Sequence, residues 1–176
     1  MKIVFDIDNT LSNPEHRLHF IQPKGEDCPV CESWGGQGAS HTRTGSCIYA
    51  KKDWDGFYAA CGDDPPIPHT VELCQDLMLA GHTVEFWTGR SDTVADTTVE
   101  WLNKHVITRE IYLNISATSE WEGMTMNMRK DGDRRPDHII KMQFIDPLDP
   151  PDIIFEDRST VVQAYRERGL TVFQVA

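Results

Sequence analysis

The sequence is poor in positive charge and has no long apolar run. Against 28 Asp and Glu it has only 17 Lys and Arg, which gives a formal net charge of −11 over 176 residues. Proteins that coat DNA or anionic membranes rely on Lys and Arg, so this class of protein is excluded. No apolar stretch reaches the ~18 residues of a membrane span, and the N-terminus lacks a signal-peptide core. The sequence predicts a soluble cytoplasmic protein, in a host cell if phage-encoded.

Cysteine is also scarce, with five residues in the chain. An odd number of cysteines, in a sequence without a secretion signal, argues against a framework of disulfide bonds. Cys28 and Cys31 have the spacing of a zinc knuckle, and His41 and Cys47 follow in the same glycine-rich segment. Together they predict a structural Zn²⁺ site of the Cys₃His kind. The alternatives are Cys61 as the fourth ligand, or a loop with ordinary reduced thiols.

The apolar pattern alternates between short buried runs and helical periods. It predicts strands at 3–5, 83–87, 109–116, 151–159 and 170–176, and helices at 69–81, 92–106 and 159–169. Residues 12–68 are expected to be irregular, and 125–145 to form a charged loop leading into a short helix. Alternating strands and helices favour an α/β fold with a parallel sheet. We expect one domain over residues 1–176, with an insertion at about 22–50.

Three of the expected strands end in polar motifs. The first ends in Asp6 and Asp8, the second runs into Thr88, and a later one ends in Glu156 and Asp157. In a parallel sheet these ends lie along one edge, where open α/β sheets bind ligands. Carboxylates gathered there repel one another unless a hard cation such as Mg²⁺ neutralises them. The alternative for the first motif alone is a turn that follows a solvated strand end.

These residue types are suited to phosphoryl transfer. An Asp can act as a covalent nucleophile that forms an aspartyl-phosphate, and a second acid two residues on can protonate the leaving oxygen. The hydroxyl and turn amides at Thr88 can bind the phosphoryl group, while Lys141 can neutralise its charge. The pattern therefore predicts an enzyme that hydrolyses phosphomonoesters.

The chain resembles the haloacid dehalogenase (HAD) superfamily in the order of its four motifs. These are DIDNTL, TGR, a downstream Lys and an acidic pair at the end of a strand. The segments MRKDGDRRPDHIIKMQF and EDRSTVVQAYRERGLTVFQVA are similar to the 3′-phosphatase domain of bacteriophage polynucleotide kinase-phosphatases. The resemblance covers residues 1–20 and 51–176, and the kinase domain has no counterpart. It implies a HAD-type, Rossmann-like fold of three layers, with a small inserted cap or zinc-knuckle-like segment.

The resemblance also assigns roles to individual residues. It implies that Asp6 is the nucleophile, Asp8 the acid and base, and Thr88 and Lys141 the phosphoryl ligands. Substrate contacts are implied for Arg90, Arg129 and Asp133, and Mg²⁺ ligation for Asp6, Asp8, Asp157 and Glu156. Two positions depart from the family pattern. Asn9 stands where glycine is commoner, and Glu156 stands where a second Asp is usual.

The substrate remains open at this point. The resemblance implies a 3′-phosphate on a nucleic acid end, whereas the net charge of −11 favours a free nucleoside monophosphate or another small phosphomonoester. A non-catalytic, metal-dependent binding module is the alternative from another class of protein. Trp54 and Phe57 are expected to pack in the core or cap. The alternative is that their rings form a surface on which the bases of a nucleic acid stack. The sequence does not indicate an oligomeric state.

Overall fold

The computed structural model describes residues 1–22, 51–116 and 124–175. These residues form two compact units, one of Met1–Asn13 with Pro65–Ala176 and the other of Pro14–Asp64. Residues 23–50 of the predicted insertion lie outside the described part of the chain, so the insertion stays a prediction. No helix in the described ranges is long and apolar enough to cross a membrane.

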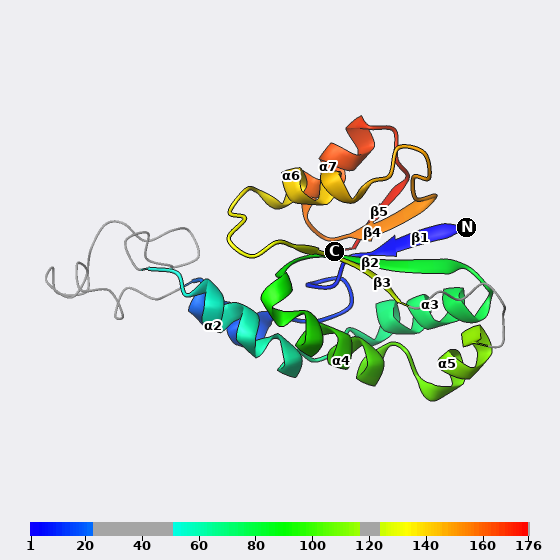
Figure 1. The fold of residues 1–176 in the computed structure, drawn as a ribbon, viewed down its shortest axis with the longest axis horizontal. Coiled ribbons are helices and arrows are strands. Elements are labelled where there is room, and N and C mark those ends of the chain that lie inside the picture. Colours follow the sequence, from blue (N-terminus) through cyan, green and yellow to red (C-terminus); the bar gives the residue numbers. More distant parts are fainter. Residues whose placement is uncertain (23–50, 117–123, 176) are drawn as a thin grey trace, which may run out of the picture. The chain divides into compact units, whose positions relative to one another are not determined.

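The larger unit is built on a parallel sheet of five strands in the order β3-β2-β1-β4-β5 (Figure 1). β1 pairs with β2 on one side and with β4 on the other, so that Phe5 lies opposite both Phe86 and Phe155. The strand bounds are Lys2–Phe5, Thr83–Ser91, Thr125–Arg129, Ile153–Glu156 and Val172–Gln174 for β1 to β5. The predicted α/β fold with a parallel sheet is confirmed.

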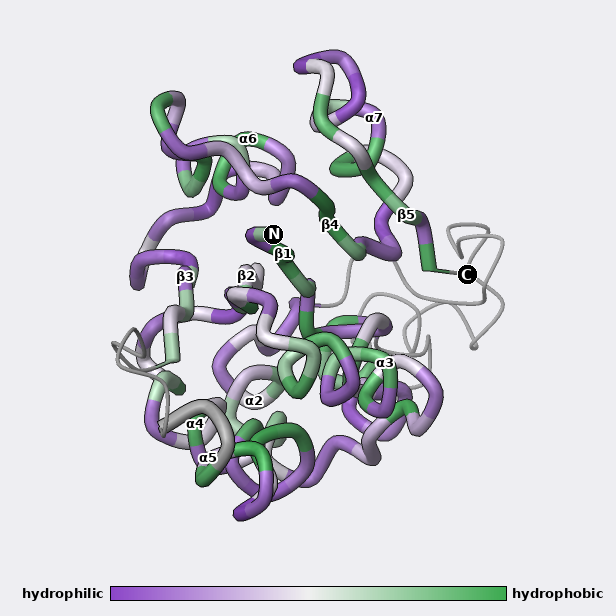
Figure 2. The backbone as a smooth tube through the Cα atoms, turned by 90° about the vertical axis from the view of Figure 1, so that its right-hand side faces the viewer, coloured by the Kyte–Doolittle hydropathy of each residue, from purple (hydrophilic) through white to green (hydrophobic). Residues whose placement is uncertain are grey.

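Helices cover both faces of this sheet, with α3, α4 and α5 on one face and α6 and α7 on the other (Figure 1). Alternate side chains of β1 face opposite layers. Ile3 and Phe5 belong to the buried cluster with α3, α4 and α5, whereas Val4 packs in the cluster that contains α7. β1 and β4 are accordingly among the most apolar segments of the backbone (Figure 2). The helix bounds are Pro68–Leu79, Ala95–His105, Arg109–Ser116, Asp137–Lys141 and Ser159–Glu167 for α3 to α7.

The prediction of a strand at 109–116 is wrong, because this segment is helix α5. The hydroxyl of Thr108 accepts a hydrogen bond from the backbone N–H of Ile111, as at a helix start. Ile111 is buried, while Tyr112 and Leu113 are exposed, which does not fit the alternation of a strand. The third strand is instead β3, within the segment predicted to be a loop. As an edge strand with several polar, half-buried residues, β3 carries little apolar signal.

Three smaller differences concern element ends. β2 continues through Thr88, Gly89 and Arg90 to Ser91, where a turn was expected. Ser91 then accepts a hydrogen bond from the N–H of Thr93 and caps a short 3₁₀ helix, η4, at Asp92–Val94. The helices expected at 69–81 and 159–169 end slightly earlier, at Leu79 and Glu167. Each is followed by a glycine with a positive φ, Gly81 and Gly169, which is a conformation that commonly ends helices.

We predicted that residues 12–68 would be irregular, but the described residues of the smaller unit include three short helical segments. They are η1 at Glu15–Phe20, α2 at Trp54–Ala59 and η3 at Ala60–Asp63. A fully buried ion pair joins η1 to the end of the unit, with Arg17 Nη2 2.7 Å from Asp64 Oδ2. The Arg17 guanidinium also lies 4.1 Å from the centre of the Phe57 ring. Phe57 therefore packs inside the unit, whereas Trp54 is 45% exposed.

Candidate active site

The predicted site residues of the larger unit converge at the carboxyl edge of its sheet. Asp6 follows β1 directly, and its backbone N–H donates to the carbonyl of Phe155 on the adjacent β4, at 2.9 Å. Glu156, the last residue of β4, lies beside it, and Thr88 lies on β2 at the other side. Parallel pairing of β1 with both neighbours thus places residues far apart in the sequence at one location.

Lys141 joins two of the acids. Its Nζ lies 2.5 Å from Asp6 Oδ1 and 2.6 Å from Glu156 Oε2, and all three side chains are almost completely buried. Glu156 Oε1 accepts a hydrogen bond from the N–H of Arg158 at 3.2 Å, so both of its oxygens have donors. The second oxygen of Asp6 accepts from the Thr10 hydroxyl at 3.4 Å. The ammonium is therefore fixed between two carboxylates, one of them the predicted nucleophile.

The electrostatics of this cluster are unbalanced. Burial raises the pKa of Asp6 to about 7, with Lys141 opposing this shift and the charges of Glu156 and Asp8 adding to it. Burial also raises the pKa values of Glu156 and Asp157, again against the effect of Lys141. Burial disfavours the ammonium of Lys141, yet Asp6 and Glu156 raise its pKa above the ordinary value. Three carboxylates here share one ammonium, which leaves an excess of negative charge.

Among the described residues, the same three carboxylates could hold a metal ion, and we call them the acidic cluster. Asp6, Glu156 and Asp157 each offer an oxygen, and these oxygens lie within 4.8 Å of one another. A divalent cation among them would balance the excess negative charge, and oxygen ligands of this kind suit Mg²⁺. The donor set therefore fits the predicted magnesium site.

The carboxylate of Asp8 is held in place by Arg90. The guanidinium donates from Nη2 to Asp8 Oδ1 at 2.7 Å and from Nε to both carboxylate oxygens at 3.1 and 3.2 Å. Arg90 is fully buried and also donates to the hydroxyls of Ser12 and Thr98. The next residue along the chain, Asn9, has a φ of 63°, a left-handed conformation that Asn tolerates. The turn and the arginine together fix the direction of the Asp8 carboxylate.

Thr88 lies on β2, next to the central strand β1, and is completely buried. Its hydroxyl accepts a hydrogen bond from the N–H of Arg90 at 3.1 Å. Gly89 lies against Asp137, and a Cβ at this position would be only 2.8 Å from Asp137 Oδ1. A side chain at this position would therefore have to displace the Asp137 carboxylate, which Arg129 and Arg158 hold by ion pairs.

Arg129 is the last residue of β3, and Asp133 lies in the loop between β3 and α6. The Arg129 guanidinium donates to the carbonyls of Gly89, Asp133 and Arg135 and forms an ion pair with Asp137. The side chain of Arg135 is bound to the Asp133 carboxylate and lowers its pKa to about 2. In the structure both predicted substrate residues thus stabilise their own loop, and their contact with a substrate stays a prediction.

Sequence reasoning missed Asp137, whose carboxylate forms ion pairs with Arg129 through one oxygen and with Arg158 through the other. It also missed Ser12, whose hydroxyl contacts Asp8, and the Arg17–Asp64 pair of the smaller unit. The only sequence signal for Asp137 is its place in the charged segment MRKDGDRRPD. The predicted zinc ligands Cys28, Cys31, His41 and Cys47 lie outside the described residues.

A family model for the phosphatase domain of polynucleotide kinase PNKP matches residues 50–176. This range includes Thr88, Lys141 and Asp157, and it begins after Asp6 and Asp8. Comparison with curated proteins finds none that matches the sequence.

Among solved structures, the fold is similar to a chain in the structure of the Pnkp1/Rnl/Hen1 RNA repair complex. The identity is 19% and the TM-score 0.59, over 99% of this chain and 42% of that chain. The class C acid phosphatase from Bacillus anthracis matches with 13% identity and a TM-score of 0.52, over 98% of this chain and 65% of that chain. A hydrolase from Pseudomonas syringae matches with 15% identity and a TM-score of 0.51, over 98% of this chain and 82% of that chain. The chain thus spans less than half of the Pnkp1 complex chains that it matches, and these likenesses are likenesses of fold.

Proposed function

The chain belongs to the family of polynucleotide kinase PNKP phosphatase domains, within the HAD phosphatases, and we propose that it hydrolyses phosphomonoesters through an aspartyl-phosphate at Asp6. The observation that carries this proposal is the buried contact between Asp6 and Lys141, 2.5 Å long, at the end of the central strand. An ammonium there lowers the cost of bringing an anionic phosphoryl group next to a carboxylate.

In the first step, a carboxylate oxygen of Asp6 attacks phosphorus, and the bond from phosphorus to the leaving oxygen breaks. Asp8 gives its proton to that oxygen, which leaves as an alcohol. In the second step, Asp8 takes a proton from water, whose oxygen attacks the phosphorus of phospho-Asp6. The phosphorus–Asp6 bond breaks, and inorganic phosphate and the carboxylate are restored. Arg90 acts as a positioning residue, because its buried guanidinium fixes the carboxylate that moves the proton.

We assign Mg²⁺ binding to Asp6 and Asp157, together with the main-chain carbonyl of Asp8. When bound, the ion supplies positive charge for the phosphoryl oxygens and for the acidic cluster. Glu156 belongs to the same cluster, but both its oxygens already accept hydrogen bonds from Lys141 and from the N–H of Arg158. Its assigned role is therefore to hold Lys141 in place.

A 3′-phosphate on a nucleic acid end is the substrate that the family membership favours. A free nucleoside monophosphate is the second candidate, because the net charge of −11 weakens the attraction to a polyanionic strand. Both reactions use the same chemistry at Asp6, and they differ in what is attached to the leaving oxygen.

The test is hydrolysis of nitrophenyl phosphate with and without Mg²⁺, followed by a panel of 3′-phosphorylated oligonucleotides and of 3′- and 5′-mononucleotides. Asp6→Asn keeps the shape of the side chain, removes the nucleophile and should abolish turnover. Asp76→Asn, at an exposed position of α3, is the matched control and should leave it unchanged. Near wild-type turnover in Asp6→Asn would show that the nucleophile is wrongly assigned. Absence of turnover on every substrate would favour a binding module without catalysis.

A further inference from the structure

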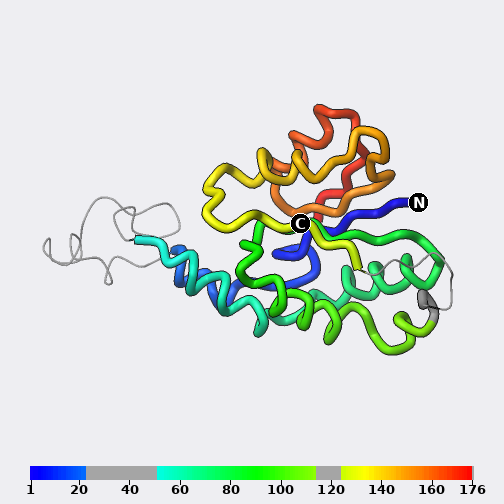
Figure 3. The backbone as a smooth tube through the Cα atoms, in the orientation of Figure 1, coloured from blue at the N-terminus to red at the C-terminus, as the bar shows by residue number. Residues whose placement is uncertain are grey.

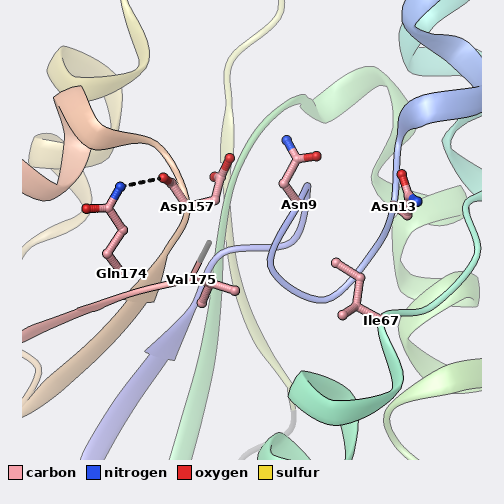
Figure 4. A pocket seen from close by; sticks show the side chains of 6 residues that line it. All are labelled: Asn9, Asn13, Ile67, Asp157, Gln174 and Val175. Atoms are coloured by element: carbon pink, nitrogen blue, oxygen red, sulfur yellow. Dashed lines mark hydrogen bonds between the residues drawn. The ribbon is translucent and has the colours of Figure 1, made fainter.

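A surface pocket opens directly beside the acidic cluster, with a volume of about 430 Å³. Small-molecule sites in proteins typically span ~300–1,000 Å³, so it can hold a group of that size. In Figure 4 one side is formed by residues after β4 and in and after β5, and the other by the turn after β1 and the segment before α3. The lining residues are Asn9, Asn13, Ile67, Asp157, Gln174 and Val175.

Two of these residues tie the pocket to the catalytic site. Asp157 belongs both to the pocket lining and to the acidic cluster with Asp6. Asn9 follows Asp8 directly, in the left-handed turn. A group seated in the pocket can therefore remain attached to a phosphate that is positioned at Asp6.

The chemistry of the lining excludes a second phosphate. None of the six lining residues is cationic, and Asp157 is an acid, so an additional anion would be repelled. Three of the six carry carboxamides, which both donate and accept hydrogen bonds, while Ile67 and Val175 are aliphatic. This combination suits a flat, uncharged group with hydrogen-bonding edges.

Two of the carboxamides are well placed for recognition. Within the described residues, the side chain of Asn9 has no hydrogen-bond partner, so it is available to a ligand. The side-chain nitrogen of Gln174 donates to the carbonyl of Asp157 at 3.1 Å and to the Ser159 hydroxyl at 3.0 Å, which fixes its orientation (Figure 4). One amide is thus adaptable and the other is held in a defined direction.

We propose that this pocket binds the nucleobase of the nucleotide whose phosphate is hydrolysed, with Asn9 and Gln174 at its edge and Ile67 and Val175 against its faces. This inference rests on the proposed phosphatase function and adds the recognition of the leaving group. A single base-bearing nucleotide is then enough for recognition. The acidic chain can therefore select nucleotides without a basic surface along a nucleic acid strand.

The test compares two 3′-phosphorylated oligonucleotides that differ only in their terminal residue, which carries a base in one and is abasic in the other. For the wild-type chain, kcat/KM should be about tenfold higher with the base present, which is the size of effect expected from one or two hydrogen bonds to the carboxamides. Ile67→Trp and Val175→Trp fill the pocket and should reduce this ratio towards one. Leu148→Trp, at a position that is 94% exposed, is the matched control and should keep it.

A second variant and a direct binding measurement guard against misfolding. Asn9→Gly keeps the left-handed turn but removes the amide, so it should also lower the ratio. In the Asp6→Asn protein, adenosine 3′-monophosphate should shift the side-chain amide NMR signals of Asn9 and Gln174, and inorganic phosphate should not. Equal kcat/KM on both oligonucleotides, or no such NMR shift, would overturn the proposal. If no phosphomonoester is hydrolysed, the proposed function fails, and the NMR measurement alone decides the pocket.

Discussion

The affinity of the site for Mg²⁺ should depend on pH through Asp6. Burial raises the pKa of this carboxyl from 3.8 to about 7, since Lys141 only partly opposes the effects of burial and of the neighbouring acids. Only the ionised carboxylate ligates a metal, so protons and Mg²⁺ compete for it. Below pH ~7 the apparent Kd for Mg²⁺ should rise about tenfold for each pH unit, or ~1.4 kcal/mol per unit. Above this pH it should level off.

The stability of the metal-free protein should depend on pH in the opposite direction: it should be higher at low pH, where binding of Mg²⁺ is weakest. Between pH ~4 and ~7 the native chain holds a proton on Asp6 that the unfolded chain has released, so the free energy of unfolding falls as the pH rises. The full effect of Asp6 over this window is of the order of 4 kcal/mol. Mg²⁺ compensates the buried negative charge that causes this loss, and it should therefore raise the Tm more at pH 8 than at pH 5.

Titration calorimetry with Mg²⁺ from pH 5 to pH 8.5, together with thermal melts with and without the ion, would measure both effects. Asp6→Asn removes the titrating group and should flatten the pH dependence, whereas the Asp76→Asn control should retain it. A Kd that does not change with pH in the wild-type protein, or the same dependence in Asp6→Asn, would refute the reasoning.

Three further predictions concern contacts of the described residues, and a fourth concerns the zinc site expected from the sequence. Asp8→Asn should slow the hydrolysis of alkyl phosphates by about 10²–10⁴-fold but that of nitrophenyl phosphate much less, and equal losses would contradict a general acid. Arg90→Lys keeps the charge but loses the two-pronged contact, so steady-state kinetics should show a lower kcat with little change in KM; a rise in KM alone would instead indicate substrate contact. Arg17→Met leaves Asp64 buried without its main partner, and urea unfolding should show a loss of about 3–5 kcal/mol; a loss below ~1 kcal/mol would contradict this. Elemental analysis should find about one zinc per chain, lost in Cys28→Ser, and an active zinc-free protein would exclude the structural site.

The sequence predicted four of the five strands. β1 and β4 read as short apolar runs because helices cover both sides of them, β2 keeps the apolar residues Phe86 and Trp87 at its buried centre, and the edge strand β5 was expected from its own short run. β3 escaped prediction because an edge strand needs fewer apolar residues, and its sequence TMNMR reads as a loop. The opposite error at α5 arose because adjacent apolar residues suggest a strand, although only Ile111 of the first five side chains is buried. Local pattern does not show which neighbours a segment will pack against.

Some features of the candidate site could likewise be predicted from the sequence, and others could not. Asp6 could be predicted because it directly follows a short apolar strand, whereas Lys141, on helix α6, was expected only from the resemblance to the HAD motifs. The binding of Lys141 by Glu156, and of Arg129 by Asp137, depends on how α6 packs against the sheet, and no spacing in the sequence indicates it. A charge-dense segment offers many possible ion pairs, and only the tertiary structure selects among them.

The central place of β1 in the sheet has a consequence for how the protein becomes active. The blue strand at the start of the chain lies between partners from the green and orange segments (Figure 3). The contact between Asp6 and Lys141 spans 135 residues of sequence. Such distant pairing is slow to form, because a long loop must close before the contact stabilises the chain. Asp6, the proposed nucleophile, therefore acquires its ammonium partner only when the two halves of the sheet have joined, and recovery of phosphatase activity during refolding should report that joining step.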